Sequence, residues 1–458
     1  FSTRIVLPQI FMPSLSPILE VATRSPPSAL TVKNIFASDF VTDFGAIHTE
    51  FTLDGRHYQV PAGIAHYLEH KLFDMPGGRD ITAEFAALGA NPNAFTSYDM
   101  TAYYFSCTEN FERCLKLLLE FVSTPYFTEE SVEKERGIID QEIGMNLDSP
   151  DSVIFDNLME SLFHCHPIRV PILGNCETIR EITPEVLHTC HRAFYHPGNM
   201  LLCVVGDGEP ETVADIAREM LGTEHREAGV KCQNWPEPMT CVTSEVTATM
   251  EVAMPMFHLG FKCDPWERGT EATRRELTAE LAAEALFGES SPLYQQLYEA
   301  GLIDTSFGGG FETIDGMALF TASGDSNDPQ AVMEAILARA REIAETGIDE
   351  ADFLRMKRSA LGRRIRSLDS FPYYNNYDIW ARDEKTLFVM SSAGIYVVDR
   401  DELLSGSENI TYDLLDARRG LTSALTANSW NYCDEHGDLF LPCDKGVVII
   451  DTERYTSG

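Results

Sequence analysis

The segment from Gly63 to Phe73, GIAHYLEHKLF, contains two histidines and a glutamate at a spacing that limits how the chain can fold. The segment is predicted to form one amphipathic helix. Residues four apart lie on one face of a helix, so His66 and His70 would project side by side. Two neutral imidazoles in that arrangement can bind one Zn²⁺ ion. Glu69 lies on the same side, where its carboxylate could accept a proton from a metal-bound water.

A second acidic pair supplies candidates for a third metal ligand. Glu135 and Glu142 are two helical turns apart and would share one face of a helix through this stretch. Catalytic zinc takes three protein ligands and keeps one position open. One glutamate could therefore bind the ion while the other orients a histidine ligand through a hydrogen bond. The competing interpretation is that the two histidines are ordinary surface residues on a helix.

With these motifs the chain resembles the pitrilysin/insulinase family of zinc peptidases, the inverzincins, which carry His-x-x-Glu-His. The matching residues are 60–73, 89–97, 133–143 and 194–200, together with His166-Pro167 and Gly174. The resemblance extends from about residue 30 to about residue 380 and is strongest to a bacterial, cytoplasmic branch of the family.

The resemblance implies a role for each matching residue of the motifs. His66, His70 and Glu142 would bind zinc, one ion per chain. Glu69 would be the general base, and Glu135 would support the catalytic site. The implied reaction is hydrolysis of a peptide bond by a metal-bound water that Glu69 activates.

A second group of residues would bind the substrate. Asn93, Ala94 and Phe95 match a family strand that forms a sheet edge beside the metal. An extended peptide can pair with such an edge through backbone hydrogen bonds, which are largely indifferent to its sequence. Asn93 would lie nearest the scissile bond, although an asparagine there is equally typical of a turn at the start of a strand.

The order of predicted elements indicates an α/β (α+β) fold with two homologous domains, which in the family close over the peptide like a clamshell. Residues 1–222 would form the catalytic domain and 223–240 a polar linker. Residues 241–382 would form a degenerate second domain that lacks the motif and its own last elements. Residues 383–458 would form a β-rich tail.

Three local patterns add detail to this plan. Residues 93–105 are rich in Thr, Tyr and Phe and are predicted to form one strand. Thr128 is predicted to cap the helix that carries the acidic pair. The run from His164 to Pro167 could be a second metal cluster, but its proline favours a structural loop.

The tail contains an internal repeat. LFVMSSAGIYVVD at 387–399 is echoed by LFLPCDKGVVIID at 439–451, an offset of 439 − 387 = 52 residues. Strand pairs with a glycine turn at this period resemble the β-propeller sensors of bacterial two-component regulators. A propeller needs about four blades or more, and fewer than two fit here, so strand edges would stay exposed. We hypothesise that the chain joins two unrelated coding segments or is a truncated fusion.

Composition limits the partners and the compartment. The net charge of −36 argues against nucleic acid or an anionic membrane as a partner. The 11 cysteines include no Cys-x-x-Cys pair, which is typical of reduced thiols in a cytoplasm. No apolar run reaches the length of a membrane span, and the prolines near the start argue against a signal peptide.

The sequence leaves two functions open. The first is a zinc-dependent endopeptidase that cleaves extended peptides or leader segments, as a homodimer or with a related subunit. The second is a catalytically impaired partner or scaffold subunit. Tyr298 and Asp304 favour the second, because they stand where family members often carry an Arg and a Tyr that hold substrate near the metal.

Overall fold

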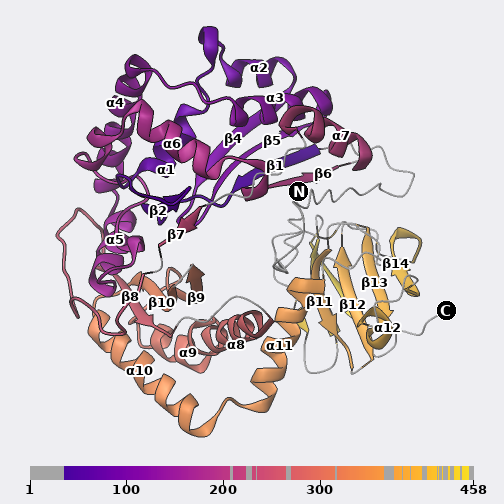
Figure 1. The fold of residues 1–458 in the computed structure, drawn as a ribbon. Coiled ribbons are helices and arrows are strands. Elements are labelled where there is room, and N and C mark those ends of the chain that lie inside the picture. The colour runs from indigo at the N-terminus through magenta and orange to yellow at the C-terminus, as the bar shows by residue number, and fades with distance from the viewer. Residues whose placement is uncertain are drawn as a thin grey trace. The chain divides into compact units, whose positions relative to one another are not determined.

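The computed structural model describes most of the chain from residue 36 to residue 452 (Figure 1). The described residues are 36–206, 210–222, 230–233, 235–264, 270–314, 317–365, 376–383, 385–391, 393–404, 410–419, 421, 425, 432–433, 438–443 and 446–452. They form two compact units, one ending at Arg339 and the other beginning at Ala340.

The first sheet has four antiparallel strands in the order β4-β5-β1-β6. Alternate residues of β1 are buried, as expected for a strand with one face on a core. Helix α3 (Phe111–Ser123) packs against β1 and β5. The strands cover, in sheet order, Ala90–Thr96, Thr101–Cys107, Phe36–Thr42 and Met200–Val205.

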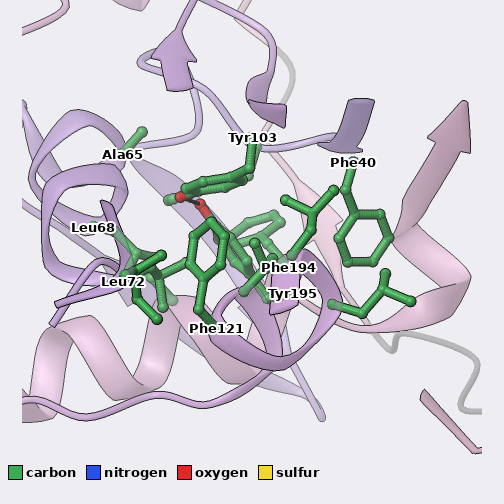
Figure 2. Packing of buried hydrophobic residues seen from close by; sticks show 14 of the residues in the cluster. Phe40, Ala65, Leu68, Leu72, Tyr103, Phe121, Phe194 and Tyr195 are labelled. Carbon is green, nitrogen blue, oxygen red and sulfur yellow. Dashed lines mark hydrogen bonds between the residues drawn. The ribbon is translucent and has the colours of Figure 1, made fainter. Parts of the chain in front are cut away.

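Large aromatic side chains fill the core between this sheet and its helices. Figure 2 shows Tyr103 of β5 and Tyr195 close together beside Phe121 of α3. The two tyrosine hydroxyls are 2.9 Å apart, so each buried polar group has a partner. The remaining elements around this core are β2 (Glu50–Leu53), β3 (Arg56–Gln59), α1 (Ile64–Lys71), α2 (Ile81–Ala87), α6 (Pro184–Phe194) and α7 (Pro210–Leu221).

The prediction of one strand over residues 93–105 is wrong, because the chain reverses in the middle of this stretch. The N–H of Ser97 donates to the carbonyl of Met100 at 2.7 Å, and Thr96 pairs with Thr101 across the hairpin. Ser97 and Asp99 are turn-forming residues, and they mark the reversal. The prediction gave more weight to the aromatic residues on either side of them, which favour a strand. The reversal makes β4 an edge strand of the sheet.

Helix α4 (Glu129–Leu147) begins at the predicted cap. The Thr128 hydroxyl accepts a hydrogen bond from the N–H of Ser131 at 3.1 Å, which confirms that prediction. The chain then turns through Asp148 into α5 (Pro150–Leu162), whose cap is Ser149. Short 3-10 helices cover Pro76–Gly78, Pro167–Arg169, Thr178–Glu181, Pro197–Asn199 and Ala417–Arg419.

A second, smaller sheet follows in the order β8-β10-β9. Helix α5 packs across β8, and the ring of Phe155 lies 5.9 Å from the ring of His258. Met159 and Leu162 of α5 share a buried cluster with Met317 and Leu319 of β10, so the two halves have a common core here. The elements are β8 (Met256–Lys262), α8 (Thr270–Phe287), α9 (Pro292–Glu299), β9 (Gly308–Ile314), β10 (Met317–Asp325) and α10 (Pro329–Thr346).

The segment predicted as a linker makes hydrogen bonds both to residues before it in the chain and to residues after it. Its strand β7 (Lys231–Cys232) pairs with β2. The carboxylate of Glu237 accepts hydrogen bonds from the N–H groups of His164, Cys165 and His166 and from Nζ of Lys262, each at 2.8–2.9 Å. Burial alone would raise the pKa of Glu237, but these hydrogen bonds lower it to about 2.

We expect the Lys262→Met variant to lower the free energy of unfolding by about 3–5 kcal/mol, because it leaves a buried carboxylate without its counter-charge. Both side chains of this pair are no more than 7% exposed. The folded-state pKa of Glu237 lies below its ordinary value of 4.5, so its stabilisation is complete above pH 4.5 and is lost as the pH falls toward 2. Urea unfolding at neutral and acidic pH measures both effects.

The Lys116→Met variant is the matched control, because Lys116 pairs with Glu219 in an exposed ion pair. Its unfolding free energy is expected to change by less than about 1 kcal/mol. Equal losses in the two variants would contradict a special role for the buried pair.

The unit that begins at Ala340 contains two antiparallel sheets, β11-β12-β13-β14 and β15-β16-β17. The hairpins β12-β13 and β16-β17 are the two copies of the predicted repeat, which confirms its strand pairs. The elements are α11 (Glu350–Ile365), β11 (Asn376–Ala381), β12 (Thr386–Ser391), β13 (Gly394–Asp399), α12 (Arg400–Leu404), β14 (Tyr412–Leu415), β15 (Tyr432–Cys433), β16 (Asp438–Cys443) and β17 (Gly446–Asp451). Among the helices described, none is both long and apolar enough to span a bilayer.

Candidate metal centre

The start of helix α1 is fixed by two glycines that meet backbone atoms. Gly63 has φ +90°, and a Cβ there would lie 2.4 Å from the carbonyl oxygen of Leu173. Gly174 has φ +68°, and a Cβ there would lie 2.5 Å from the carbonyl oxygen of Ala62. A side chain at either position would clash and would also be strained. This close approach sets the position of α1 against the loop around residue 174.

Helices α1 and α4 bring three potential ligands together. Nε2 of His66 and Nε2 of His70 each lie 3.7 Å from Oε2 of Glu142. The ligand atoms all lie within 4.8 Å of one another. Across the parts of the chain that the structure describes, this is the one cluster of His, Cys, Asp and Glu that could hold a metal ion. Two imidazole nitrogens and a carboxylate oxygen suit a divalent transition metal.

The electrostatic state of His66 also suits a metal ligand. Burial, and then the neighbouring His70, lower the pKa of His66 to about 3, so the ring is neutral at pH 7. A neutral imidazole is the form that binds a metal ion. Its Nδ1 is buried without a hydrogen-bond partner, and its Nε2 faces Glu142.

His70 has a carboxylate partner behind it. Its Nδ1–H donates to Oε1 of Glu135 at 2.9 Å, which leaves Nε2 facing Glu142. Burial would lower the pKa of His70, but the carboxylates of Glu135, Glu69 and Glu142 outweigh it and raise the pKa. The hydrogen bond fixes the tautomer and the orientation of the ring, as second partners of metal-binding histidines do.

Glu69 lies beside the cluster and is held by a residue that the sequence reasoning missed. The hydroxyl of Thr96 on β4 donates to Oε2 of Glu69 at 2.9 Å. Burial raises the pKa of Glu69, and the hydrogen bond from Thr96 opposes the rise. The signal was available in the sequence, because Thr96 shares a strand face with Ala94 in the predicted substrate-binding run.

Asn93, Ala94 and Phe95 lie on the edge strand β4, which contacts α1. Oδ1 of Asn93 accepts a hydrogen bond from the N–H of Ala94 at 2.9 Å. Phe95 is 40% exposed, and its ring lies edge-on to that of Tyr104. Within the described residues, β4 pairs with β5 alone, so its other edge is open beside the motif helix.

Three other residues singled out in the sequence have local roles. His166 accepts a hydrogen bond from the N–H of Ile168 and is buried in a loop, as Pro167 indicated. Tyr298 stacks on Tyr294 one helical turn away. The carboxylate of Asp304 accepts a hydrogen bond from the N–H of Ser306.

Two family models match the chain in succession. The model described as insulinase (Peptidase family M16) matches residues 55–175, and the Peptidase M16 inactive domain matches residues 181–360. Among curated proteins, the uncharacterized zinc protease YmfH of Bacillus subtilis is 39% identical over 347 residues. That match covers 74% of this chain and 79% of the relative.

Solved structures show the same fold. An M16-like peptidase from Alicyclobacillus acidocaldarius matches with a TM-score of 0.71 and 34% identity, over 76% of this chain and 82% of that one. A protease from Helicobacter pylori matches with a TM-score of 0.62 and 19% identity, over 74% and 81% of the two chains. The fold is thus the predicted pair of α/β domains. On this evidence the chain belongs to the M16 family of peptidases, the pitrilysin/insulinase family.

Proposed function

We propose that this chain is a zinc-dependent endopeptidase that cleaves extended peptides or leader segments. The observation that carries the proposal is the convergence of His66, His70 and Glu142 beside the buried carboxylate of Glu69. The names of relatives such as the zinc protease YmfH support zinc as the metal. Two nitrogens and one oxygen form a three-ligand set of the kind found at catalytic zinc, one ion per chain.

In this proposal each residue of the chain has one task. Bound zinc supplies a Lewis acid that polarises the scissile carbonyl and promotes ionisation of water. Glu69 takes a proton from the attacking water and passes it to the amine that leaves. Because Thr96 donates to Oε2, the other oxygen, Oε1, is the atom proposed to carry the proton. Glu135 keeps His70 in the tautomer that presents Nε2 to the metal.

The open edge of β4 is the proposed binding site for the peptide backbone. A peptide that pairs with this strand would lie beside α1, with Asn93 near the scissile bond. Such pairing selects for an extended chain more than for a particular sequence. Ten cysteines in the described part of the chain lie outside any disulfide, which supports a reducing compartment, and we propose the cytoplasm.

The second candidate function is a scaffold or partner subunit, alone or paired with a related peptidase subunit. Tyr298 and Asp304 favour it, because neither supplies the positive charge or the phenol expected near the substrate. The match of residues 181–360 to a domain described as inactive is compatible with either function, since the metal cluster lies outside that range.

A reconstitution experiment tests the proposal on the full chain. The protein is stripped with a chelator, titrated with zinc and assayed on a quenched peptide library. We expect one zinc per chain and cleavage that requires the metal. Zinc binding without cleavage would favour the scaffold, and failure to bind zinc would contradict the ligand assignment.

We expect the Glu135→Ala variant to bind zinc about 10- to 100-fold more weakly, because His70 loses the carboxylate that orients it. Competition with a chromophoric chelator measures the affinity. The Glu133→Ala variant is the control, since Glu133 is exposed on the same helix and pairs with Arg136. Equal affinities for the Glu135 variant and the wild type would contradict this role.

We expect the Thr96→Val variant to lower kcat about 10- to 150-fold with little change in KM, because one hydrogen bond to a charged group is worth about 1.5–3 kcal/mol. Valine has the shape of threonine without its hydroxyl. The Thr96→Ser variant keeps the hydroxyl and should restore most of kcat. Steady-state kinetics on one peptide compare the three proteins, and a valine variant with wild-type kcat would exclude a positioning role.

A further inference from the structure

Each histidine of the metal centre is followed, on helix α1, by a buried residue with a polar end. Tyr67 comes after His66, and Lys71 comes after His70. Both side chains are 0% exposed. Because residues four apart share one face of a helix, Tyr67 and Lys71 form a second row on α1, beside the row of the two histidines. Lysine is seldom fully buried unless its ammonium group has partners, so the partners indicate what this residue does.

Both residues of the second row donate to the backbone of helix α4. The hydroxyl of Tyr67 donates to the carbonyl of Val132. Nζ of Lys71 donates to the carbonyl of Ser131 at 3.2 Å and also pairs with the carboxylate of Asp74, which balances its charge. The two carbonyls are consecutive and lie near the start of α4. This end of α4 is therefore held against α1 at two adjacent points.

The position of α4 matters because this helix carries both carboxylates of the metal centre. In an α-helix the carbonyl of residue 131 also accepts the N–H of residue 135, so the group that Lys71 contacts bonds the backbone of Glu135. Glu142 lies 142 − 131 = 11 residues after Ser131, about 16 Å along the helix axis. A small tilt or rotation at the start of α4 would therefore move Glu142 relative to the histidines. Residues of a metal site must be held within about 0.5 Å of their working geometry.

We propose that Tyr67 and Lys71 are positioning residues of the metal centre. They set the register and the tilt of α4, so that its two carboxylates meet the histidines of α1. Each acts through a backbone carbonyl of α4 rather than by binding the metal. Lys71 makes the larger contribution, because hydrogen bonds from a charged donor are stronger than those from a neutral one. The inference rests on the zinc site proposed above.

Zinc affinity of the full chain, measured by competition with a chromophoric chelator, tests the proposal. We expect Lys71→Met to bind zinc about 10-fold more weakly, the lower end of what loss of a hydrogen-bond partner of a ligand costs. Tyr67→Phe should lose less, and the double variant should lose more than either. Methionine keeps the apolar stem of lysine, and Asp74 is 48% exposed, so water can solvate its carboxylate in the variant. Circular dichroism verifies that each protein is folded.

The Lys262→Met variant is the matched control for the lysine. Nζ of Lys262 is also buried and bonds one carboxylate and two backbone carbonyls, and none of these partners lies on α1 or α4. This variant should be less stable and still bind zinc with wild-type affinity. Tyr103→Phe is the control for the hydroxyl, since it removes a buried hydroxyl that bonds another tyrosine. It should also keep wild-type zinc affinity.

A background without the two carboxylates separates the positioning of α4 from any other effect of the lysine. In the double variant Glu135→Ala, Glu142→Ala, the site retains only the two histidines of α1. Adding Lys71→Met to this background should change zinc affinity no further, because α4 then has no carboxylate left to position. Calorimetric titration with zinc measures this weaker binding.

The outcomes separate this proposal from the zinc site itself. Wild-type zinc affinity in the variant that lacks both Tyr67 and Lys71 would overturn the positioning role and leave the zinc site intact. A loss of full size in the carboxylate-free background would also overturn it, because the lysine would then act on α1 itself. Failure of the wild type to bind zinc would contradict the ligand assignment and this proposal together.

Discussion

Replacing Glu69 with glutamine is expected to lower kcat for peptide cleavage by about 10²- to 10⁴-fold and to leave zinc binding at the wild-type level. Glutamine has the shape of glutamate, and its carbonyl oxygen can still accept the hydrogen bond from Thr96. It cannot take up a proton at neutral pH. Steady-state kinetics and elemental analysis on the same preparation measure the two properties together.

The Glu133→Gln variant is the control for this substitution, because that carboxylate is exposed on α4 and outside the metal cluster. Its activity and zinc content should equal those of the wild type. A Glu69→Gln variant that cleaves at the wild-type rate would show that another group accepts the proton. Zinc-loaded wild-type protein that cleaves nothing would favour the scaffold function instead.

The His66→Ala variant is expected to lose both zinc and activity, which separates it from Glu69→Gln. Only one imidazole and one carboxylate would remain as ligands. Zinc affinity should therefore fall further than in the Glu135→Ala variant, which loses only a hydrogen-bond partner of a ligand and is expected to bind about 10- to 100-fold more weakly. Zinc that binds only the folded state raises the melting temperature, and this rise should be absent from the variant. Calorimetry with and without zinc measures it.

The control for the second substitution is His57→Ala, since His57 is an exposed histidine paired with Glu50 on the hairpin β2-β3. It should keep the zinc-dependent rise in melting temperature. If the His66 variant bound zinc as tightly as the wild type, zinc would have to bind elsewhere in the protein. The assignment of His66, His70 and Glu142 as its ligands would then be wrong.

Local signals in the sequence were sufficient for the two helices that carry the metal cluster, α1 and α4. The Thr128 cap was predicted from residue types within one turn, and the structure confirms it. The spacing of His66 and His70 placed both on one face, and the structure brings to them Glu142, which lies 142 − 70 = 72 residues after His70. The prediction that Glu142 is the third ligand rested on the family resemblance. Helical periodicity shows which residues share a face of one helix, but it does not show which helices lie next to each other. The roles of these residues stay predictions.

Long-range contacts explain what the sequence reasoning missed. Thr96 acts on Glu69 only because β4 and β5 reverse direction and place β4 beside α1. Glu237 lies in a polar stretch with prolines nearby, which is typical of a linker. Its partners are three amides about 70 residues earlier and Lys262, and no local pattern marks such a set.

The close approach of the backbone segments 62–63 and 173–174 has a consequence for how this sequence can change over evolutionary time. For each glycine the atom nearest to an added Cβ is a main-chain carbonyl oxygen, of Leu173 for Gly63 and of Ala62 for Gly174. A larger residue at one position therefore has no compensating substitution at the other, because neither carbonyl can be mutated away. We expect the two positions to tolerate no replacement, singly or together, while the metal-binding helix between residues 64 and 71 keeps its place. Random libraries aimed at altered specificity should leave both codons fixed.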